Sequence, residues 1–263
     1  MKISLCSISF RDLPIEKVIS KAAGFGYHGV EIVGGHLQDY LQRGNKLSSL
    51  RKLTQRYGLS IPVISPYFNF TGDKEEFEKS VKLACRFMEY AVQLDCKIIR
   101  TFVGNVGSDE ATPEQWRRCI VALQEICRTG KEAGVFFALE THPHQLMDTT
   151  RTTLRLLKEV DAPNLKVLLD VWHLFNEARE DPLEALNLLF PHVVHVHVKN
   201  MRRAKNYRKI VHLEEGDMDY TPFLKSLKEK GYKGFISVEW FGENPWEAVR
   251  HEIRYLKDTL STF

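Results

Sequence analysis

The amino-acid sequence predicts an α/β fold, a (β/α)₈ TIM barrel, and three observations support this fold class. Short apolar runs rich in β-branched residues alternate with longer amphipathic stretches along the whole chain. Several amphipathic stretches end at a glycine shortly before the next apolar run, as in YGLSIPV and EAGVFFAL. The length of 263 residues is close to the roughly 250 that such a barrel usually requires.

Eight apolar runs have the length and composition of buried parallel strands. They cover residues 2–9, 29–33, 60–65, 97–102, 135–140, 165–170, 193–198 and 234–239. Strands that alternate with helices run parallel and are joined by right-handed crossovers. A doubly wound open sheet has the same alternation, but no glycine-rich phosphate loop follows the first strand. We therefore expect the eight units to close into a barrel.

Eight amphipathic stretches are expected to form the outer helices. They cover residues 14–25, 45–57, 73–94, 113–133, 149–160, 181–190, 219–230 and 244–260. The fourth has strong end signals, with Thr112 as a cap, Pro113 in the first turn and Gly134 just past the end. Because the chain contains no linker or low-complexity tract, we expect a single domain over residues 1–263.

Composition and charge narrow the classes of function. Hydrophobic residues make up 43% of the chain and charged residues 27%, which is ordinary for a globular protein. The net charge of +3 gives no reason to expect nucleic acid or a membrane as partner. The opening run MKISLCSISF lacks the features of a secretory signal, and the five cysteines form no CxxC pair. We expect a cytoplasmic protein that acts on a small molecule, and we leave a homo-oligomer open.

Four neighbouring strands deliver potential metal ligands to one end of the predicted barrel. The fifth, sixth and eighth strands end in Glu140, Asp170 and Glu239, and the seventh carries His195 and His197. One such carboxylate alone is often a helix cap, and one such histidine an ordinary buried residue. Their coincidence at the carboxyl ends of the strands, where barrels of this kind have their active sites, favours a metal site. The donors suit Mn²⁺, Mg²⁺, Co²⁺ or Zn²⁺, and a dication would relieve the repulsion between the carboxylates.

Three further polar residues are expected near the same end of the barrel. Arg100 in IIRTF would be costly to bury unless it meets an anion. His142 follows Glu140 by two residues and Lys199 follows His197 by two, so both are expected to point into the mouth. A lysine beside a dication loses its proton more easily, which suits an acid–base role. Exposed loop positions are an equally good interpretation of Arg100, His142 and Lys199.

Together these motifs resemble the xylose isomerase-like TIM barrel superfamily of sugar and sugar-phosphate isomerases and epimerases, inosose dehydratases and endonuclease IV-type enzymes. The resemblance implies one divalent metal ion, with Mn²⁺ as the first choice, held by Glu140, Asp170, His197 and Glu239. His197 is preferred to His195 because the second histidine of such a pair is usually the ligand. His173 completes the superfamily's D-x-x-H pair, with an orienting or substrate-binding role, and Arg203 falls six residues after His197, as in the ketose epimerases.

Longer strings are similar to the bacterial 3-dehydroshikimate dehydratases of petrobactin-type siderophore synthesis. They are SLCSISFR, IRTFVG, LETHPHQLMDT, LKEVDAPNLKVLLDVWH, HVHVKN and SVEWFG. This likeness implies that Arg100, His142 and Lys199 handle the substrate, together with Tyr67 in SPYFNF. The segment 201–218 is shorter and more basic than in those dehydratases. It is compatible with contacts to a phosphorylated sugar or with a solvated basic loop.

The resemblance implies proton abstraction beside a carbonyl that the dication polarises. We expect a lyase that converts 3-dehydroshikimate to protocatechuate, in which Lys199 or His142 takes the α-proton and the other assists departure of the hydroxyl. The alternative is a sugar or sugar-phosphate (ketose) isomerase or epimerase, in which Glu140 and Glu239 would be catalytic and shuttle the proton. Leu146 stands where those epimerases carry a further glutamate.

Two other interpretations are less favoured. An endonuclease of this superfamily would need a histidine at the end of the third strand, where the sequence is SPYF, and a D-x-H motif where residues 217–219 are Asp-Met-Asp. A noncatalytic binding barrel would be expected to lack ligands, and none of the set is missing. We therefore expect an enzyme with a polyhydroxy carbonyl substrate.

Overall fold

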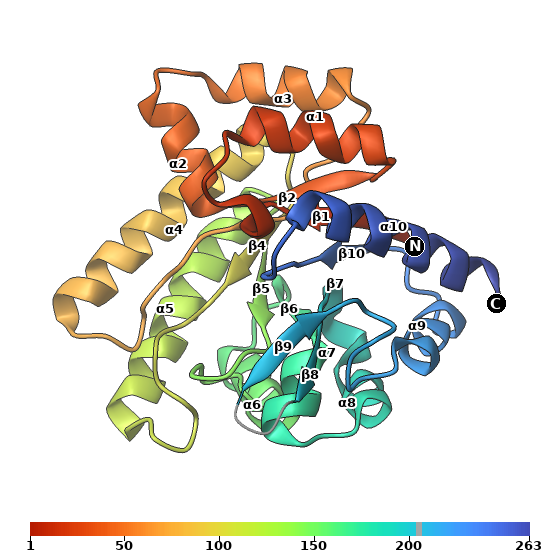
Figure 1. The fold of residues 1–263 in the computed structure, drawn as a ribbon. Helices are drawn as coiled ribbons and strands as arrows, with labels where there is room; N and C mark the ends of the chain where they lie inside the picture. Colours follow the sequence, from red (N-terminus) through yellow and green to blue (C-terminus); the bar gives the residue numbers. More distant parts are fainter. Residues whose placement is uncertain (204–206) are drawn as a thin grey trace.

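In the computed structural model, which describes residues 1–203 and 207–263, eight parallel strands close into a barrel surrounded by helices (Figure 1). The strands follow one another around the ring in the order β1-β10-β7-β6-β5-β4-β3-β2. They are β1 (Lys2–Cys6), β2 (Gly29–Val33), β3 (Ile64–Ser65), β4 (Ile98–Thr101), β5 (Phe136–Glu140), β6 (Leu165–Asp170), β7 (Val193–Val198) and β10 (Phe235–Val238). The predicted (β/α)₈ TIM barrel is confirmed.

All eight predicted helices are present, with ends shifted by at most two residues. The helices are α1 (Ile15–Phe25), α2 (Gly34–Gln42), α3 (Leu47–Arg56), α4 (Lys74–Leu94), α5 (Pro113–Glu132), α6 (Thr150–Val160), α7 (Val171–His173), α8 (Pro182–Leu189), α9 (Tyr220–Glu229) and α10 (Pro245–Ser261). Shorter turns are η1 (Ser7–Phe10), η2 (Leu174–Ala178) and η3 (Phe190–His192). Helix α2 was not predicted, because it begins with two glycines, which are poor helix formers. No helix among the described residues has the length and apolar character needed to cross a membrane.

Several helix ends are set by residues that the sequence identifies. The Thr112 side chain accepts a hydrogen bond from the backbone N–H of Gln115, whose own side chain accepts one from the Thr112 backbone. This reciprocal capping box begins α5. Gly134 and Gly231 have φ values of 68° and 76°, in the left-handed region that favours glycine. These glycines turn the chain from a helix back into the next strand.

The strand register brings polar side chains to one level inside the barrel. Asp170 of β6 lies opposite His197 of β7. Because side chains alternate along a strand, residues two positions earlier face the same way and lie one level deeper. At that deeper level Val63, Ala138 and Leu168 form a buried apolar cluster. Below β3, β5 and β6 an apolar layer therefore supports the polar level, whereas His195 of β7 and Ser237 of β10 make the deeper level polar on the other side.

A two-stranded antiparallel hairpin follows β7 and forms part of the segment 201–218. Its strands are β8 (Asn200–Arg203) and β9 (Arg208–Val211). It was not predicted, because its basic residues read as a loop in the sequence. The hairpin is anchored to the barrel at its base, where the Asn200 side chain donates hydrogen bonds of 2.7 Å to the carbonyls of Leu213 and Met218.

Candidate active site

The carboxyl ends of the barrel strands surround a cavity of about 220 Å³, which offers room for a small molecule. Phe102 and Phe241 contribute aromatic side chains to its wall, beside the charged groups. Seven residues that the sequence identified line this cavity: Tyr67, Arg100, Glu140, His142, His197, Lys199 and Glu239. The mouth of the barrel is therefore the candidate active site.

Three carboxylates and one imidazole meet at the ends of β5, β6, β7 and β10. One potential ligand atom from each of Glu140, Asp170, His197 and Glu239 lies within 4.8 Å of the others, and all four residues are buried. Burial raises the pKa of Asp170, against the opposing effect of Lys199. Burial would also raise the pKa of Glu140, but the neighbouring His197 and Arg100 hold it below its ordinary value. We refer to these four residues as the carboxylate cluster.

Lys199 contacts two members of the carboxylate cluster. Its Nζ atom lies 2.6 Å from Asp170 Oδ2 and 2.7 Å from Glu239 Oε2. Burial alone would lower the pKa of this amine, but the two carboxylates raise it above its ordinary value. Without a cation at the cluster, the contacts of Lys199 with its own neighbours therefore favour the ammonium form.

Arg100 meets an anion, as its position in a buried strand requires. Its Nη1 atom lies 3.2 Å from Glu140 Oε2, and its Nη2 atom donates to the backbone carbonyl of Ser65 at 3.1 Å. The guanidinium carbon lies 4.4 Å from the ring centroid of Tyr67 and 4.0 Å from that of Phe102. The guanidinium thus has polar partners along its edge and aromatic rings against its faces.

The hydrogen bond of His142 indicates which of its ring nitrogens is free. Nδ1 lies 2.7 Å from the backbone oxygen of Pro143, which can only accept a hydrogen bond. In the neutral ring Nδ1 therefore carries the proton, and the lone pair is on Nε2. His144, by contrast, is exposed and lies outside the cavity lining. The two histidines of ETHPH therefore have different surroundings.

His173 lies behind His142 and does not line the cavity. The centroids of the two rings are 4.2 Å apart, and the His173 Nε2 atom lies 3.6 Å from Asp170 Oδ2. The Asp170 carboxylate also accepts a hydrogen bond from the His173 backbone N–H, which begins α7. Burial lowers the pKa of His173 well below its ordinary value, so the ring is neutral. This position fits the orienting role expected for His173.

Arg203 is not brought to the cavity. It is an exposed residue of the hairpin strand β8, and its backbone N–H donates to Asp217 Oδ2 at 2.8 Å. Its guanidinium lies 3.5 Å from Asn176 Oδ1. The predicted substrate-binding residues Tyr67 and Arg100 therefore share the cavity, whereas Arg203 lies apart from them.

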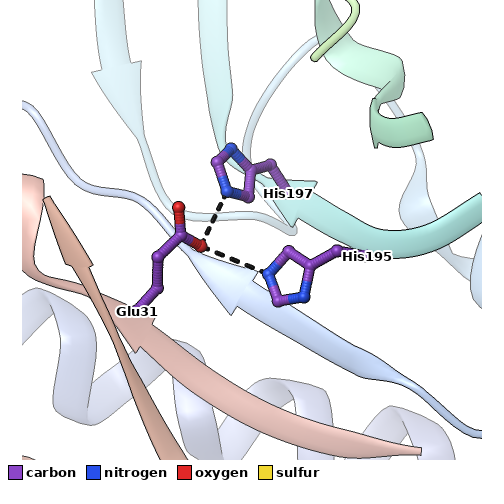
Figure 2. A group of neighbouring side chains, drawn as sticks. All are labelled: Glu31, His195 and His197. Atoms are coloured by element: carbon purple, nitrogen blue, oxygen red, sulfur yellow. Dashed lines mark hydrogen bonds and ion pairs between the residues drawn. The ribbon is translucent and has the colours of Figure 1, made fainter. Parts of the chain in front are cut away.

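Glu31 is a buried cavity residue that the sequence analysis missed. It is the third residue of β2, in the run GVEIV, and its carboxylate lies between His195 and His197 (Figure 2). A glutamate within an otherwise apolar strand was the available signal. Its histidine partners lie more than 160 residues away in the chain, and no local pattern connects them with Glu31.

The donor set of the carboxylate cluster fits a divalent cation. Three carboxylates and one imidazole supply hard oxygen donors and a single nitrogen. His197 Nδ1 is buried, lies 3.3 Å from Glu140 Oε1 and has no hydrogen-bond partner within the part of the chain that the structure describes. A cation between these groups would use that nitrogen and offset the negative charge of the carboxylates. The cluster could therefore hold a divalent metal.

Known proteins that are similar to this chain have the same fold and include enzymes. A sequence model of the family described as "Xylose isomerase-like TIM barrel" matches residues 19–259. The chain is 31% identical to a 3-dehydroshikimate dehydratase of Bacillus anthracis, over 97% of this chain and 96% of that protein.

Two solved structures can be superimposed on almost the whole chain. One is the "probable 3-DHS dehydratase AsbF involved in the petrobactin synthesis from Bacillus anthracis", with a TM-score of 0.87, 30% identity and coverage of 98% of this chain and 99% of that chain. The other is an L-ribulose 3-epimerase, with a TM-score of 0.83, 19% identity and coverage of 99% and 95%. The second likeness is one of fold alone.

Proposed function

Since the chain belongs to the xylose isomerase-like TIM barrel family, we propose that it is a divalent-metal-dependent 3-dehydroshikimate dehydratase that forms protocatechuate. Its sequence relatives include a 3-dehydroshikimate dehydratase and inosose dehydratases, so we take the chain to be an enzyme of the lyase or isomerase type that processes sugar-like substrates. The convergence of the carboxylate cluster, His142 and Lys199 at one small cavity supports this function.

The carboxylate cluster would hold the cation through Glu140, Asp170, His197 and Glu239, with Mn²⁺ as the first choice. When bound, the cation would act as a Lewis acid toward the substrate carbonyl and acidify the adjacent C–H bond. Arg100 keeps Glu140 ionised and in place. Lys199 contacts Asp170 and Glu239 and holds these two carboxylates in place.

His142 is assigned as the base. It lines the cavity, and the hydrogen bond from Nδ1 to the Pro143 carbonyl leaves the Nε2 lone pair free to accept a proton. In the dehydration it would take the proton from the carbon next to the ketone. The electron pair of the broken C–H bond forms the new carbon–carbon double bond.

Lys199 is assigned as the acid. Its ammonium group donates to two carboxylates and carries no lone pair that could act as a base. It would protonate the departing β-hydroxyl, which leaves as water when the C–O bond breaks. Enolisation of the product then gives the aromatic ring of protocatechuate, so that the net change is the loss of one water molecule.

The positive side chains of the cavity suit a substrate that carries a carboxylate. Arg100 lies within the cavity wall and the exposed Arg11 lines its rim. Tyr67 is 54% exposed and lies against the guanidinium of Arg100, where it can cover a bound ring. We assign Tyr67 and Arg100 to substrate binding on these contacts.

A ketose or ketose-phosphate isomerase or epimerase is the second candidate. It is favoured by Glu140 and Glu239, which both line the cavity and lie 3.3 Å and 3.5 Å from His197 Nδ1. It is disfavoured by Leu146, which is fully buried at the position where the epimerases carry a further glutamate. A hydrocarbon side chain there cannot take part in proton transfer.

Incubation of the Mn²⁺-loaded protein with 3-dehydroshikimate tests the proposal, with protocatechuate followed by its ultraviolet absorbance. Ketoses and ketose phosphates are offered in parallel reactions and analysed by chromatography. We expect protocatechuate from 3-dehydroshikimate and no conversion of the sugars. Turnover of a ketose without any protocatechuate would establish the second candidate instead. If the protein binds one of these compounds but converts none of them, the result would point to a noncatalytic barrel.

A further inference from the structure

We propose that Glu31 is a positioning residue for the metal site, which orients His197 so that its Nδ1 lone pair points at the carboxylate cluster. The inference rests on the proposed metal site and adds a residue outside the ligand set. Glu31 itself does not coordinate the metal ion. It acts through the far side of the imidazole.

The geometry places the two nitrogens of His197 between two different environments. Nε2 lies 2.8 Å from Glu31 Oε2 (Figure 2). Nδ1 lies 3.3 Å from Glu140 Oε1 and 3.5 Å from Glu239 Oε1, without a hydrogen bond to any described residue. One nitrogen is therefore used by Glu31, and the other is available to a cation.

The chemistry of the imidazole explains why this contact matters. A neutral ring has one N–H and one lone pair, and a carboxylate can only accept a hydrogen bond. Contact with Glu31 therefore keeps the proton on Nε2 and the lone pair on Nδ1. A carboxylate behind a ligating histidine also strengthens the nitrogen as a donor, and loss of such a partner typically weakens metal binding by about 10–100-fold.

Glu31 is itself held in one orientation. The Ser65 hydroxyl donates to Oε1, and His195 Nε2 lies 3.2 Å from Oε2. The carboxylate reaches across the barrel, because β2 and β7 are separated in the ring by β1 and β10. Burying a carboxylate is costly, and an apolar side chain would fill the same interior space at lower cost. The position of Glu31 therefore has its explanation in the histidine that it orients.

A second metal ion held by Glu31, His195 and His197 is the competing interpretation, since their potential ligand atoms also lie within 4.8 Å of one another. The atoms of Glu31, His195 and His197 that face one another are already paired by hydrogen bonds, however. The Glu31–His197 separation is that of a hydrogen bond, and His195 Nε2 lies 2.8 Å from the Ser237 hydroxyl oxygen. We therefore expect one metal ion per chain.

The test measures Mn²⁺ affinity and stoichiometry by calorimetry for the wild type, Glu31→Met and Glu31→Gln. Glu31→Met removes the acceptor, and Glu31→Gln keeps an acceptor oxygen without the charge. Glu252→Gln is the matched control, because Glu252 is also buried and hydrogen-bonded to a histidine, His212, outside the cavity. The ¹⁵N resonances of His197 in the metal-free protein, recorded at alkaline pH where the ring is neutral, report which nitrogen carries the proton.

We expect one Mn²⁺ per wild-type chain, about 10–100-fold weaker binding in Glu31→Met and a smaller loss in Glu31→Gln. Glu252→Gln should bind like the wild type. The Nε2 proton of His197 should be present in the wild type and in Glu31→Gln, and the two tautomers should mix in Glu31→Met. If Glu31→Met does not fold, Glu31→Gln alone decides the affinity comparison.

Three outcomes would overturn the inference. Wild-type affinity in both Glu31 variants, with the His197 tautomer unchanged, would remove the role of Glu31 and leave the proposed metal site intact. Two Mn²⁺ per wild-type chain would make Glu31 a ligand of a second ion. A wild type that takes up no divalent metal would overturn the proposed metal site together with the inference.

Discussion

Arg100 and Glu140 form an ion pair inside the barrel, with Nη1 3.2 Å from Oε2 and each side chain only 4% exposed. A second contact, in which Nη2 donates to the Ser65 carbonyl, also holds the guanidinium. The pair holds the carboxylate at the end of β5 where the metal site is proposed. Removal of one partner of such a buried pair destabilises the fold, because the other partner is left as an uncompensated buried charge.

Replacement of Arg100 by methionine should therefore destabilise the metal-free protein. We expect the free energy of unfolding to fall by about 3 kcal/mol, since the Glu140 carboxylate would stay buried without its partner. Urea denaturation followed by circular dichroism measures the change. Arg117→Met is the control, because the Arg117–Glu114 pair is exposed and should contribute little. Equal losses in the two variants would contradict this role of the buried pair.

His142→Gln should reduce kcat/KM for 3-dehydroshikimate by about 10²–10⁴-fold, because the substitution removes the proposed base. Affinity for Mn²⁺ should stay unchanged, since His142 is not part of the carboxylate cluster. Steady-state kinetics and calorimetry provide the two measurements. His144→Gln is the matched control, two residues away and exposed, and should retain wild-type kinetics. A comparable loss in His144→Gln, or none in His142→Gln, would argue against the assignment.

Glu239→Gln tests the ligand set, because it exchanges an anionic donor for a neutral one of the same shape. The loss of Mn²⁺ affinity should exceed the roughly 10-fold minimum typical of residues behind a ligand. Metal content after dialysis, measured by atomic emission, checks this outcome. Glu243→Gln, an exposed change four residues further on, should leave metal content at the wild-type level. Unchanged metal content in Glu239→Gln would remove Glu239 from the ligand set.

Stability should depend on pH through Glu252. Burial raises the pKa of this carboxyl to about 8, and Glu214 adds to the effect. The native state therefore favours the protonated form of Glu252. Its contribution to the free energy of unfolding is fully present below about pH 4.3, the ordinary pKa of glutamate, and is lost as the pH rises through 8. Unfolding free energies of the wild type and Glu252→Gln, measured from pH 4 to 9, should diverge by on the order of a few kcal/mol, with the wild type losing stability. A constant difference over this range would contradict the raised pKa.

The barrel could be predicted because its signals are local. Gly134 and Gly231 mark helix ends, Thr112 marks a helix start, and each strand is a short apolar run. Helix α2 was not predicted, because packing overrides the poor helix propensity of its first two glycines. The hairpin of β8 and β9 escaped because its basic residues carry no alternating apolar pattern.

The site could be predicted where the fold alone positions a residue. Glu140 and Asp170 end their strands, and the barrel brings all strand ends to one mouth. The contacts of Lys199 with Asp170 and Glu239 could not be predicted, because no sequence pattern contains those distances. The role of Glu31 depends likewise on a contact across the barrel.

We propose that this chain uses a divalent metal at the carboxylate cluster to dehydrate 3-dehydroshikimate. The most direct test follows protocatechuate formation before chelation, after removal of metal with EDTA and dialysis, and after addition of Mn²⁺. We expect turnover that disappears with the metal and returns with Mn²⁺ in the wild type, but does not return in Asp170→Asn. Undiminished protocatechuate formation by the metal-free protein, or none by the Mn²⁺-loaded wild type, would contradict the claim.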